Sequence, residues 1–244
     1  MSGHSKWHNI QAKKSKTDAA RAKVFTKIGK EIAIAIREGG PNPASNSKLR
    51  DLISKAKANN VPNDNIDRII KKATEEKKDY KEITYEGYGP GGVAVIVETA
   101  TDNTNRTVGN VRAFFSKFHG NIGNTGCVGF MFEEKGIITI EKEDCNIDEE
   151  ALMELALEAG AEDFSAEDDD FFEITTAPAD LIAVQESITS AGVKLASTDV
   201  AKIPSNYVDL DNEDDIKYMT LLLDKLEEDD DVQQVYHNWN GPKE

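Results

Sequence analysis

Lysine and arginine side chains are the groups in this sequence whose types and spacing could do chemistry. They are concentrated in the first third of the chain, where residues 1–78 hold 18 Lys and Arg against 8 Asp and Glu, a net charge of +10. Several cations on one surface can bind a nucleic-acid backbone by displacing counterions from its phosphates. The usual alternative, a solvated lysine-rich face, stays open. The residues that we predict to bind nucleic acid in this segment are Lys6, Lys13, Lys14, Lys16, Arg21, Lys23, Lys27, Lys30, Lys48, Arg50, Lys55, Lys57, Arg68, Lys71 and Lys72.

An aromatic pair near the N-terminus adds a second kind of contact. Trp7 and His8 follow Lys6 directly. Aromatic rings can stack on an unpaired base, as is common in RNA recognition. Packing of the tryptophan on the helices that follow is an equal alternative. We therefore include both rings in the predicted nucleic-acid site.

A polar segment at the start of a helix, Thr101–Thr107, is a further candidate. Its Asp102, Asn103 or Thr104 could cap the helix. Arg106 does not fit the role of a cap and could reach either a phosphate or a carboxylate. We include Arg106 among the predicted nucleic-acid contacts, with both alternatives open.

Other polar or glycine-rich segments give weaker indications. The segment from Tyr85 to Gly92 is dense in glycine, but a strand follows it, so a tight turn or close backbone packing fits better than a dinucleotide cradle. The acidic stretch from Glu162 to Asp170 is expected to be a solvated hairpin turn. His and Cys residues show no zinc spacing, and no nucleophile motif or phosphate-binding loop occurs. We expect no catalytic residues, no metal and no cofactor, and hence a protein that is not an enzyme.

The rest of the chain has the opposite charge. Residues 79–244 hold 11 Lys and Arg against 37 Asp and Glu, a net of −26 within a total of −16. A polyanion would repel this part, so the protein should approach nucleic acid with residues 1–79 only. The two cysteines, the missing apolar leader and the lack of a long apolar run favour a cytoplasmic protein without membrane contact.

Hydrophobic periodicity predicts an α+β protein. Three amphipathic helices are expected, over residues 19–38, over 47–59 and from about Asn63. Strands at 93–97 and 127–132 then flank a helix at 104–119. Residues 136–203 follow the β-α-β-β-α-β order of a ferredoxin-like unit. A short strand near Tyr207, a helix at 213–226 and a strand at 232–239 end the chain.

These elements predict three domains. Residues 1–79 form a basic helical domain with an N-terminal arm, residues 80–132 and 205–244 form a discontinuous α/β domain, and residues 133–204 form an inserted ferredoxin-like α/β domain. The inference rests on the tail, which supplies an α-β half that residues 83–132 lack.

Several motifs together resemble the YebC/PmpR family. They are Gly3–Trp7, Phe25 with Lys30-Glu31-Ile32, Asn46 with Leu49-Arg50, Asn60-Val61-Pro62 with Ile66 and Arg68–Lys71, Tyr85–Val93, and Asp102-Asn103 with Asn105-Arg106-Thr107. The resemblance covers the full chain. The sequence departs from the family pattern at Ala73–Glu75, at Phe118–Gly120 and at Cys127. The resemblance implies a helical N-terminal domain and two α/β domains, one inserted in the other.

The resemblance also implies a function in gene expression. Bacterial members are described as probable transcriptional regulators that bind DNA, the mitochondrial branch is a translational activator, and a ribosome-associated role in easing difficult peptide synthesis is proposed for bacterial members. Three hypotheses follow: a regulator on duplex DNA, a translation factor on ribosomal RNA, and an acidic module that binds the ribosome or basic proteins without touching nucleic acid. The lysine-rich character of the helices favours contact with a nucleic-acid backbone over the reading of base edges.

Overall fold

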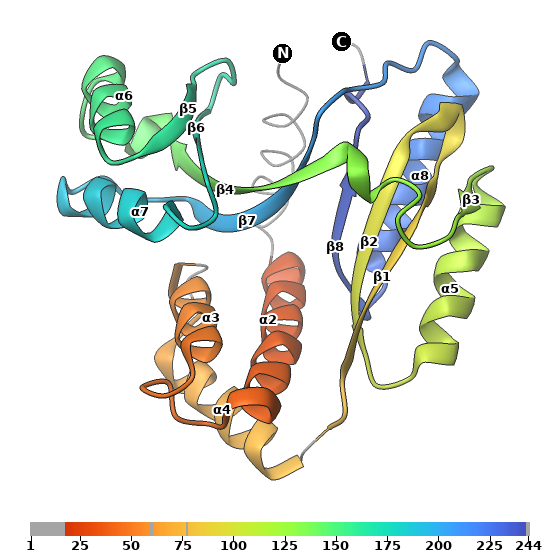
Figure 1. Cartoon of the computed structure of the whole chain (residues 1–244), viewed down its shortest axis with the longest axis horizontal. Helices are drawn as coiled ribbons and strands as arrows, with labels where there is room; N and C mark the ends of the chain where they lie inside the picture. The colour runs from red at the N-terminus through yellow and green to blue at the C-terminus, as the bar shows by residue number, and fades with distance from the viewer. Residues whose placement is uncertain (1–17, 59–60, 77, 243–244) are drawn as a thin grey trace. The chain divides into compact units, whose positions relative to one another are not determined.

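A computed structural model describes residues 18–58, 61–76 and 78–242 of the chain (Figure 1). The described residues group into two compact units. The first unit joins residues 18–132 to residues 204–242, so it is built from two separate stretches of sequence. The second unit is the intervening segment Glu133–Ile203.

Three helices open the first unit: α2 (Asp18–Gly39), α3 (Ser47–Ala58) and α4 (Asn63–Glu76). Helix α2 is amphipathic, as predicted, because its Ile28, Ile32 and Ile36 are buried in one cluster with residues of α3 and α4. The turn before α3 is held by the buried Asn46, whose Oδ1 accepts the Leu49 N–H at 3.0 Å. All three predicted helices are confirmed.

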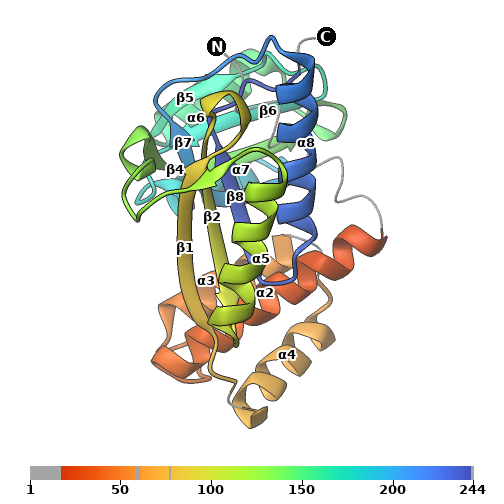
Figure 2. The ribbon, with the colours of Figure 1, turned by 90° about the vertical axis from the view of Figure 1, so that its right-hand side faces the viewer.

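A four-stranded antiparallel sheet forms the rest of the first unit. Its strands are β1 (Lys81–Tyr88), β2 (Ala94–Thr101), β3 (Asn121–Ile122) and β8 (Val232–His237), in the order β3-β1-β2-β8. The helices α5 (Thr104–Lys117) and α8 (Glu213–Glu228) pack beside each other on one face of it (Figure 2). Because β8 pairs with the central strand β2, the C-terminal segment completes a sheet begun more than a hundred residues earlier.

The second unit has its own sheet. Strands β4 (Phe132–Glu141), β5 (Ala161–Ser165), β6 (Phe171–Thr176) and β7 (Ser197–Pro204) stand in the order β5-β6-β4-β7. Helices α6 (Glu149–Glu158) and α7 (Leu181–Ser190) pack against each other and share one core with β4 and β6. The β-α-β-β-α-β succession agrees with the predicted order of elements.

Two of the predicted strands are wrong, and two strands were missed. The segment predicted as a strand at 127–132 is a turn followed by the short 3-10 helix η2 (Gly129–Met131). The expected strand near Tyr207 is reduced to one isolated bridge, between Val208 and Trp239. The unforeseen strands are the two-residue β3 and β1, which precedes the short 3-10 turn η1 (Pro90–Gly92). No helix in the described ranges is long and apolar enough to span a membrane.

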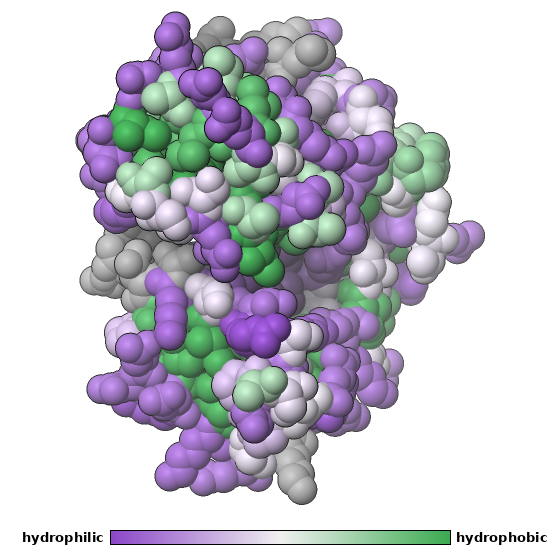
Figure 3. Space-filling view, turned by 60° about the vertical axis from the view of Figure 1, so that its left-hand side comes forward, coloured by the Kyte–Doolittle hydropathy of each residue, from purple (hydrophilic) through white to green (hydrophobic). Residues whose placement is uncertain are grey.

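Hydrophobic and polar residues are mixed on the surface shown in Figure 3. The second unit exposes several large apolar side chains on its helices. Met153 and Leu157 of α6 are 40% and 47% exposed, and Ile182 of α7 is 54% exposed.

The short 3-10 turn η3 (Lys142–Asp144) lies between β4 and α6 in the second unit.

Candidate nucleic-acid interface

The N-terminal part of the predicted site lies outside the described residues. This concerns Lys6, Trp7, His8, Lys13, Lys14 and Lys16, and also the side chain of Arg21 on the first turn of α2. Their role stays a prediction.

Four of the predicted cations are exposed and make no ion pair with the side chains that the structure describes. They are Lys23 on α2, Arg50 and Lys57 on α3, and Arg68 on α4. Arg50 and Lys57 are seven residues apart, so they project from the same side of α3. Arg68 lies opposite the buried Ile66 stripe of α4. These side chains are free to contact a phosphate.

Three further cations are exposed but paired. Lys48 lies 3.3 Å from Glu38, Lys71 lies 4.0 Å from Glu75, and Lys72 lies 3.8 Å from Glu76. Exposed pairs of this kind contribute between zero and about 1 kcal/mol and are screened by salt. A phosphate can therefore compete for these lysines.

Lys27 and Lys55 are partly withdrawn from solvent. Lys27 Nζ donates to the Gln233 carbonyl oxygen at 3.0 Å, and burial lowers the pKa of this lysine. Lys55 lies 3.4 Å from Glu31, with about a fifth of each side chain exposed. Both lysines are less suited to a phosphate than the sequence indicated.

Lys30 is buried, which corrects its assignment to the docking surface. Its ammonium group donates to the Asp231 carboxylate at 2.9 Å, to the Ala100 carbonyl oxygen at 3.1 Å and to the Asp230 carbonyl oxygen at 2.6 Å. With all three protons used, this lysine has none left for a ligand. It fastens α2 to the sheet of the same unit instead.

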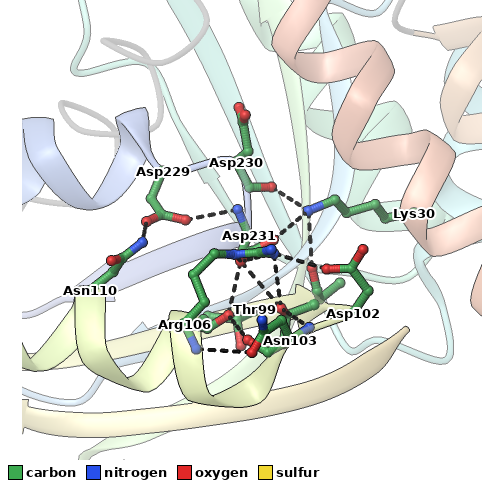
Figure 4. A network of polar contacts seen from close by, with 12 residues as sticks. Lys30, Thr99, Asp102, Asn103, Arg106, Asn110, Asp229, Asp230 and Asp231 are labelled. Carbon is green, nitrogen blue, oxygen red and sulfur yellow. Dashed lines mark hydrogen bonds and ion pairs between the residues drawn. The ribbon is translucent and has the colours of Figure 1, made fainter. Parts of the chain in front are cut away.

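Asp231 is the centre of this polar network (Figure 4). Its Oδ2 accepts from Arg106 Nε at 3.0 Å and Nη2 at 2.7 Å, and from Thr107 Oγ1 at 2.9 Å. Burial alone would raise the pKa of Asp231. The hydrogen bonds from Lys30, Arg106 and Thr107 outweigh it and lower that pKa below its usual range. The carboxylate therefore stays charged inside the protein.

The network also decides between the two alternatives for Arg106. Its guanidinium group binds carboxylates, Asp231 and also Asp102 at 2.9 Å. The helix cap is Asn103, whose side chain accepts the Arg106 N–H at 3.1 Å. Arg106 thus holds the start of α5 in place, and a phosphate would have to displace two carboxylates to reach it.

Sequence reasoning missed Asp231. It ends the acidic run Glu227–Asp231, which is typical of a solvated turn. Two other members also bind distant residues: Asp229 accepts from Asn110 at 2.9 Å, and the Asp230 carbonyl oxygen accepts from Lys30. The available signal was positional, because the run directly precedes a predicted strand.

A second carboxylate fills what would otherwise be an anion site. The buried Glu86 on β1 accepts the backbone N–H groups of Gly126, Val128 and Gly129 at 2.8, 2.9 and 2.7 Å. Burial raises the pKa of Glu86, and these three donors lower it by more. Converging backbone N–H groups are a common phosphate cradle. Here the protein's own side chain occupies it.

Metal binding has no support in the part of the chain that the structure describes. No group of three or more His, Cys, Asp or Glu residues there could hold a metal ion. Glu162 and Asp163 of the acidic stretch lie on β5, and the rest of it forms the β5–β6 turn, as expected; there Asp168 accepts the N–H groups of Asp170 and Phe171.

Comparisons with known proteins agree with this architecture. The family model for the TACO1/YebC N-terminal domain matches residues 5–76, and the model for the TACO1/YebC second and third domains matches residues 80–239. A conserved hypothetical protein from Aquifex aeolicus, solved by crystallography, superposes with a TM-score of 0.83 at 43% identity, covering 94% of each chain.

Curated relatives match over the full length. A protein of Clostridium botulinum (strain Eklund 17B) is 57% identical, and one of Hathewaya histolytica is 58% identical; each alignment covers 100% of this chain and 98% of the relative. Both relatives are named probable transcriptional regulatory proteins. With family models that together match nearly all of its length, the chain belongs to the TACO1/YebC family.

Proposed function

We propose that this protein is a non-enzymatic, nucleic-acid-binding regulator of gene expression in the cytoplasm. Its helical N-terminal domain, residues 1–79, docks on the phosphates of DNA or of ribosomal RNA. The discontinuous α/β domain (residues 80–132 and 205–244) and the inserted domain (residues 133–204) take no part in this docking contact. The names of the relatives support the regulatory role.

One observation carries the proposal. Helices α2, α3 and α4 carry exposed cations that form no ion pair with a described side chain, among them Lys23, Arg50, Lys57 and Arg68. Residues 79–244, by contrast, carry a net charge of −26. Such a division favours an end-on approach to a polyanion, because the acidic part is repelled from it. The seven-residue spacing of Arg50 and Lys57 also matches contact with one strand of phosphates along one side of α3.

A charge-reversal variant tests the docking surface. Arg50→Glu, Lys57→Glu and Arg68→Glu are combined. Lys135→Glu, Lys194→Glu and Lys202→Glu on the second unit, also combined, serve as the control with the same change in net charge. Binding is measured at one salt concentration to a promoter duplex, a scrambled duplex and purified ribosomes. The triple variant should lose affinity for the true target, whereas the control binds as the wild type does. Equal binding by the triple variant and the control would reject the docking surface.

The same assay distinguishes the two targets. A transcriptional regulator should prefer the promoter duplex over the scrambled one, since base contacts add sequence discrimination to the phosphate term. A translation factor should co-sediment with ribosomes and treat both duplexes alike. If the triple variant loses binding to duplex and to ribosomes, its three residues belong to the docking surface. The preference of the wild type among duplexes and ribosomes identifies the target.

A competing function is an acidic protein-binding module. Its supporting observation is the set of exposed apolar side chains on α6 and α7, Met153, Leu157 and Ile182, within a strongly acidic unit. This function predicts that the triple variant keeps its cellular activity. Substitution of Leu157 and Ile182 by serine should then abolish that activity, while nucleic-acid binding stays as in the wild type.

A further inference from the structure

A stacked pair of rings joins the end of α5 to α8. The imidazole of His119 and the phenol ring of Tyr218 lie with their centroids 4.2 Å apart and their planes 25° from parallel. Figure 2 shows the two helices side by side, which agrees with their contacts. His119 is exposed, so the stack lies at the protein surface.

The backbone at His119 is of a kind that normally takes glycine. His119 has φ 61°, and it is the one non-glycine residue with positive φ among those described. The conformation closes α5: the Gly120 N–H donates to the Phe115 carbonyl oxygen at 2.8 Å, the helix-ending bond of a Schellman motif. Glycine serves this position without steric cost, so the closure of the helix gives no reason for an imidazole. The side chain must contribute something else.

The two helices that carry the stack also carry cations without an ion pair among the described residues. Of the six Lys and Arg residues in the described ranges 80–132 and 204–242, Arg106 and Lys225 are in ion pairs. The four without an ion pair in those ranges are Lys81, Arg112, Lys117 and Lys217, and three of them lie on α5 or α8. Lys217 Nζ lies 5.8 Å from the centre of the Tyr218 ring, and Lys117 Nζ lies 5.4 Å from that of Phe118. In an otherwise acidic part of the chain, Lys217 thus lies beside the half-buried ring of Tyr218, and Lys117 lies two residues before the exposed His119.

This combination fits a ligand that is both flat and anionic. An unpaired base can stack on an exposed aromatic ring such as His119. The phosphates on either side of that base can then be neutralised by lysine side chains near the ring. A base inside a duplex is already stacked on its neighbours and cannot take the same position. Lys117 also complements the negative end of α5, which is the purely structural role of such a residue.

We propose that the His119–Tyr218 stack is a second nucleic-acid contact, on which an unpaired base of single-stranded RNA stacks while Lys117 and Lys217 neutralise its phosphates. This contact lies on the sheet part of the first unit and not on the helical domain. It rests on the proposed function, because it presupposes that the protein binds nucleic acid.

The test uses the full chain and a short single-stranded RNA of mixed sequence, with affinity measured by fluorescence anisotropy. His119→Gly is the informative variant, because glycine suits the backbone at this position and the fold should lose no stability. We expect its affinity to fall about fivefold or more, the effect of one lost base stack. Lys117→Gln with Lys217→Gln should weaken binding as well, whereas Lys81→Gln should not.

Four outcomes are decisive. If His119→Gly binds RNA with wild-type affinity, the inference is wrong, and His119 serves only to end helix α5. A loss in His119→Gly of equal size for duplex and single-stranded RNA would also overturn it, because a duplex offers no unpaired base. Failure of the wild type to bind any nucleic acid would reject the proposed function together with this contact. If the triple charge-reversal variant loses binding and the His119 and lysine variants of this contact do not, the second contact is rejected and the proposed function is not.

Discussion

Lys30 Nζ lies 2.9 Å from Asp231 Oδ1, which joins two residues that are 201 positions apart in the chain. Both side chains are almost completely removed from solvent, with 11% and 5% exposed. The pair connects the first helix of the structure to the turn before its last strand. Lys30, which the sequence predicted to bind nucleic acid, instead stabilises the fold. The docking surface therefore contains fewer cations than the sequence predicted.

Removal of Lys30 should destabilise the first unit strongly. Lys30→Met leaves Asp231 buried with one cation fewer, and breaking a buried pair from one side costs about 3–5 kcal/mol. The free energy of unfolding in urea measures the loss. Asp231→Asn completes a double-mutant cycle, in which the two effects should not add because both remove the same interaction. Full additivity would contradict the role given to this pair.

The acid side of the stability curve should depend on Asp231. Its pKa is lower in the folded protein than in the unfolded chain. Its contribution is therefore complete above the unfolded pKa of about 3.9 and is lost as the pH falls through the lower folded value. Thermal unfolding between about pH 2 and pH 5 should show a shallower decline in Asp231→Asn than in the wild type. An unchanged slope would show that Asp231 is not charged in the fold.

Glu86 should determine the structure of the segment from Gly126 to Gly129. Glu86→Gln replaces a carboxylate by an amide with a single acceptor oxygen, so at least one N–H group loses its partner. Hydrogen bonds to charged groups contribute about 1.5–3 kcal/mol each, and we expect a loss of roughly that size or more. Hydrogen exchange at these amides should rise in the variant. Glu98→Gln on the neighbouring strand is a control for the charge change, and protection of Gly126 and Val128 that persists in Glu86→Gln would disprove the cradle.

Glu173 should make the second unit less stable as the pH rises. Burial raises the pKa of Glu173 to about 7, with further contributions from Asp163 and Asp168. The folded state therefore holds a proton that the unfolded state releases at about pH 4.3, and stability falls between these two values. Glu173→Gln should abolish this decline and stabilise the protein by up to about 3 kcal/mol above pH 7. A wild-type melting temperature that stays constant from pH 5 to pH 8 would refute the assignment.

Salt dependence should separate the free cations from the buried ones. Each phosphate contact adds about 0.7–0.9 to the slope of log affinity against log salt. Arg50→Gln or Lys57→Gln should lower this slope by up to about one unit, because their side chains are exposed and unpaired. Lys27→Met serves as the comparison, since Lys27 Nζ already donates to a carbonyl oxygen. Equal slopes in all three variants would indicate that α3 does not contact the phosphates.

The order of elements was largely predictable, and the errors have a common cause. Strand β1 was missed because Gly87 and the glycines that directly follow the strand are typical of a turn. Gly87 is required there by packing, since a Cβ atom would lie 2.4 Å from the Asn121 carbonyl oxygen. The false strand at 127–132 has an apolar pattern because Val128 is buried, while the backbone N–H groups around it bind Glu86. Local pattern cannot show that a backbone is already engaged elsewhere.

For the candidate site, the sequence showed which segment holds the cations but not which of their side chains stay exposed. Helical periodicity placed Lys23 off the apolar stripe of α2, and it is exposed, as are the predicted contacts Arg50 and Arg68. The same reasoning placed Lys30 off the stripe of α2, and it is buried. Its partner comes from the far end of the chain, so no pattern within α2 could reveal it.

The amino-acid sequence by itself determined the α+β class, the three N-terminal helices and the opposite charges of the two parts of the chain, because periodicity and composition are local properties. The tertiary structure decided which charges remain available. Asp231 can hold Lys30 and Arg106 only because β8 pairs with β2 and brings the last acidic run beside α2 and α5. Ion pairs between distant segments depend on distances that exist only after the chain has folded.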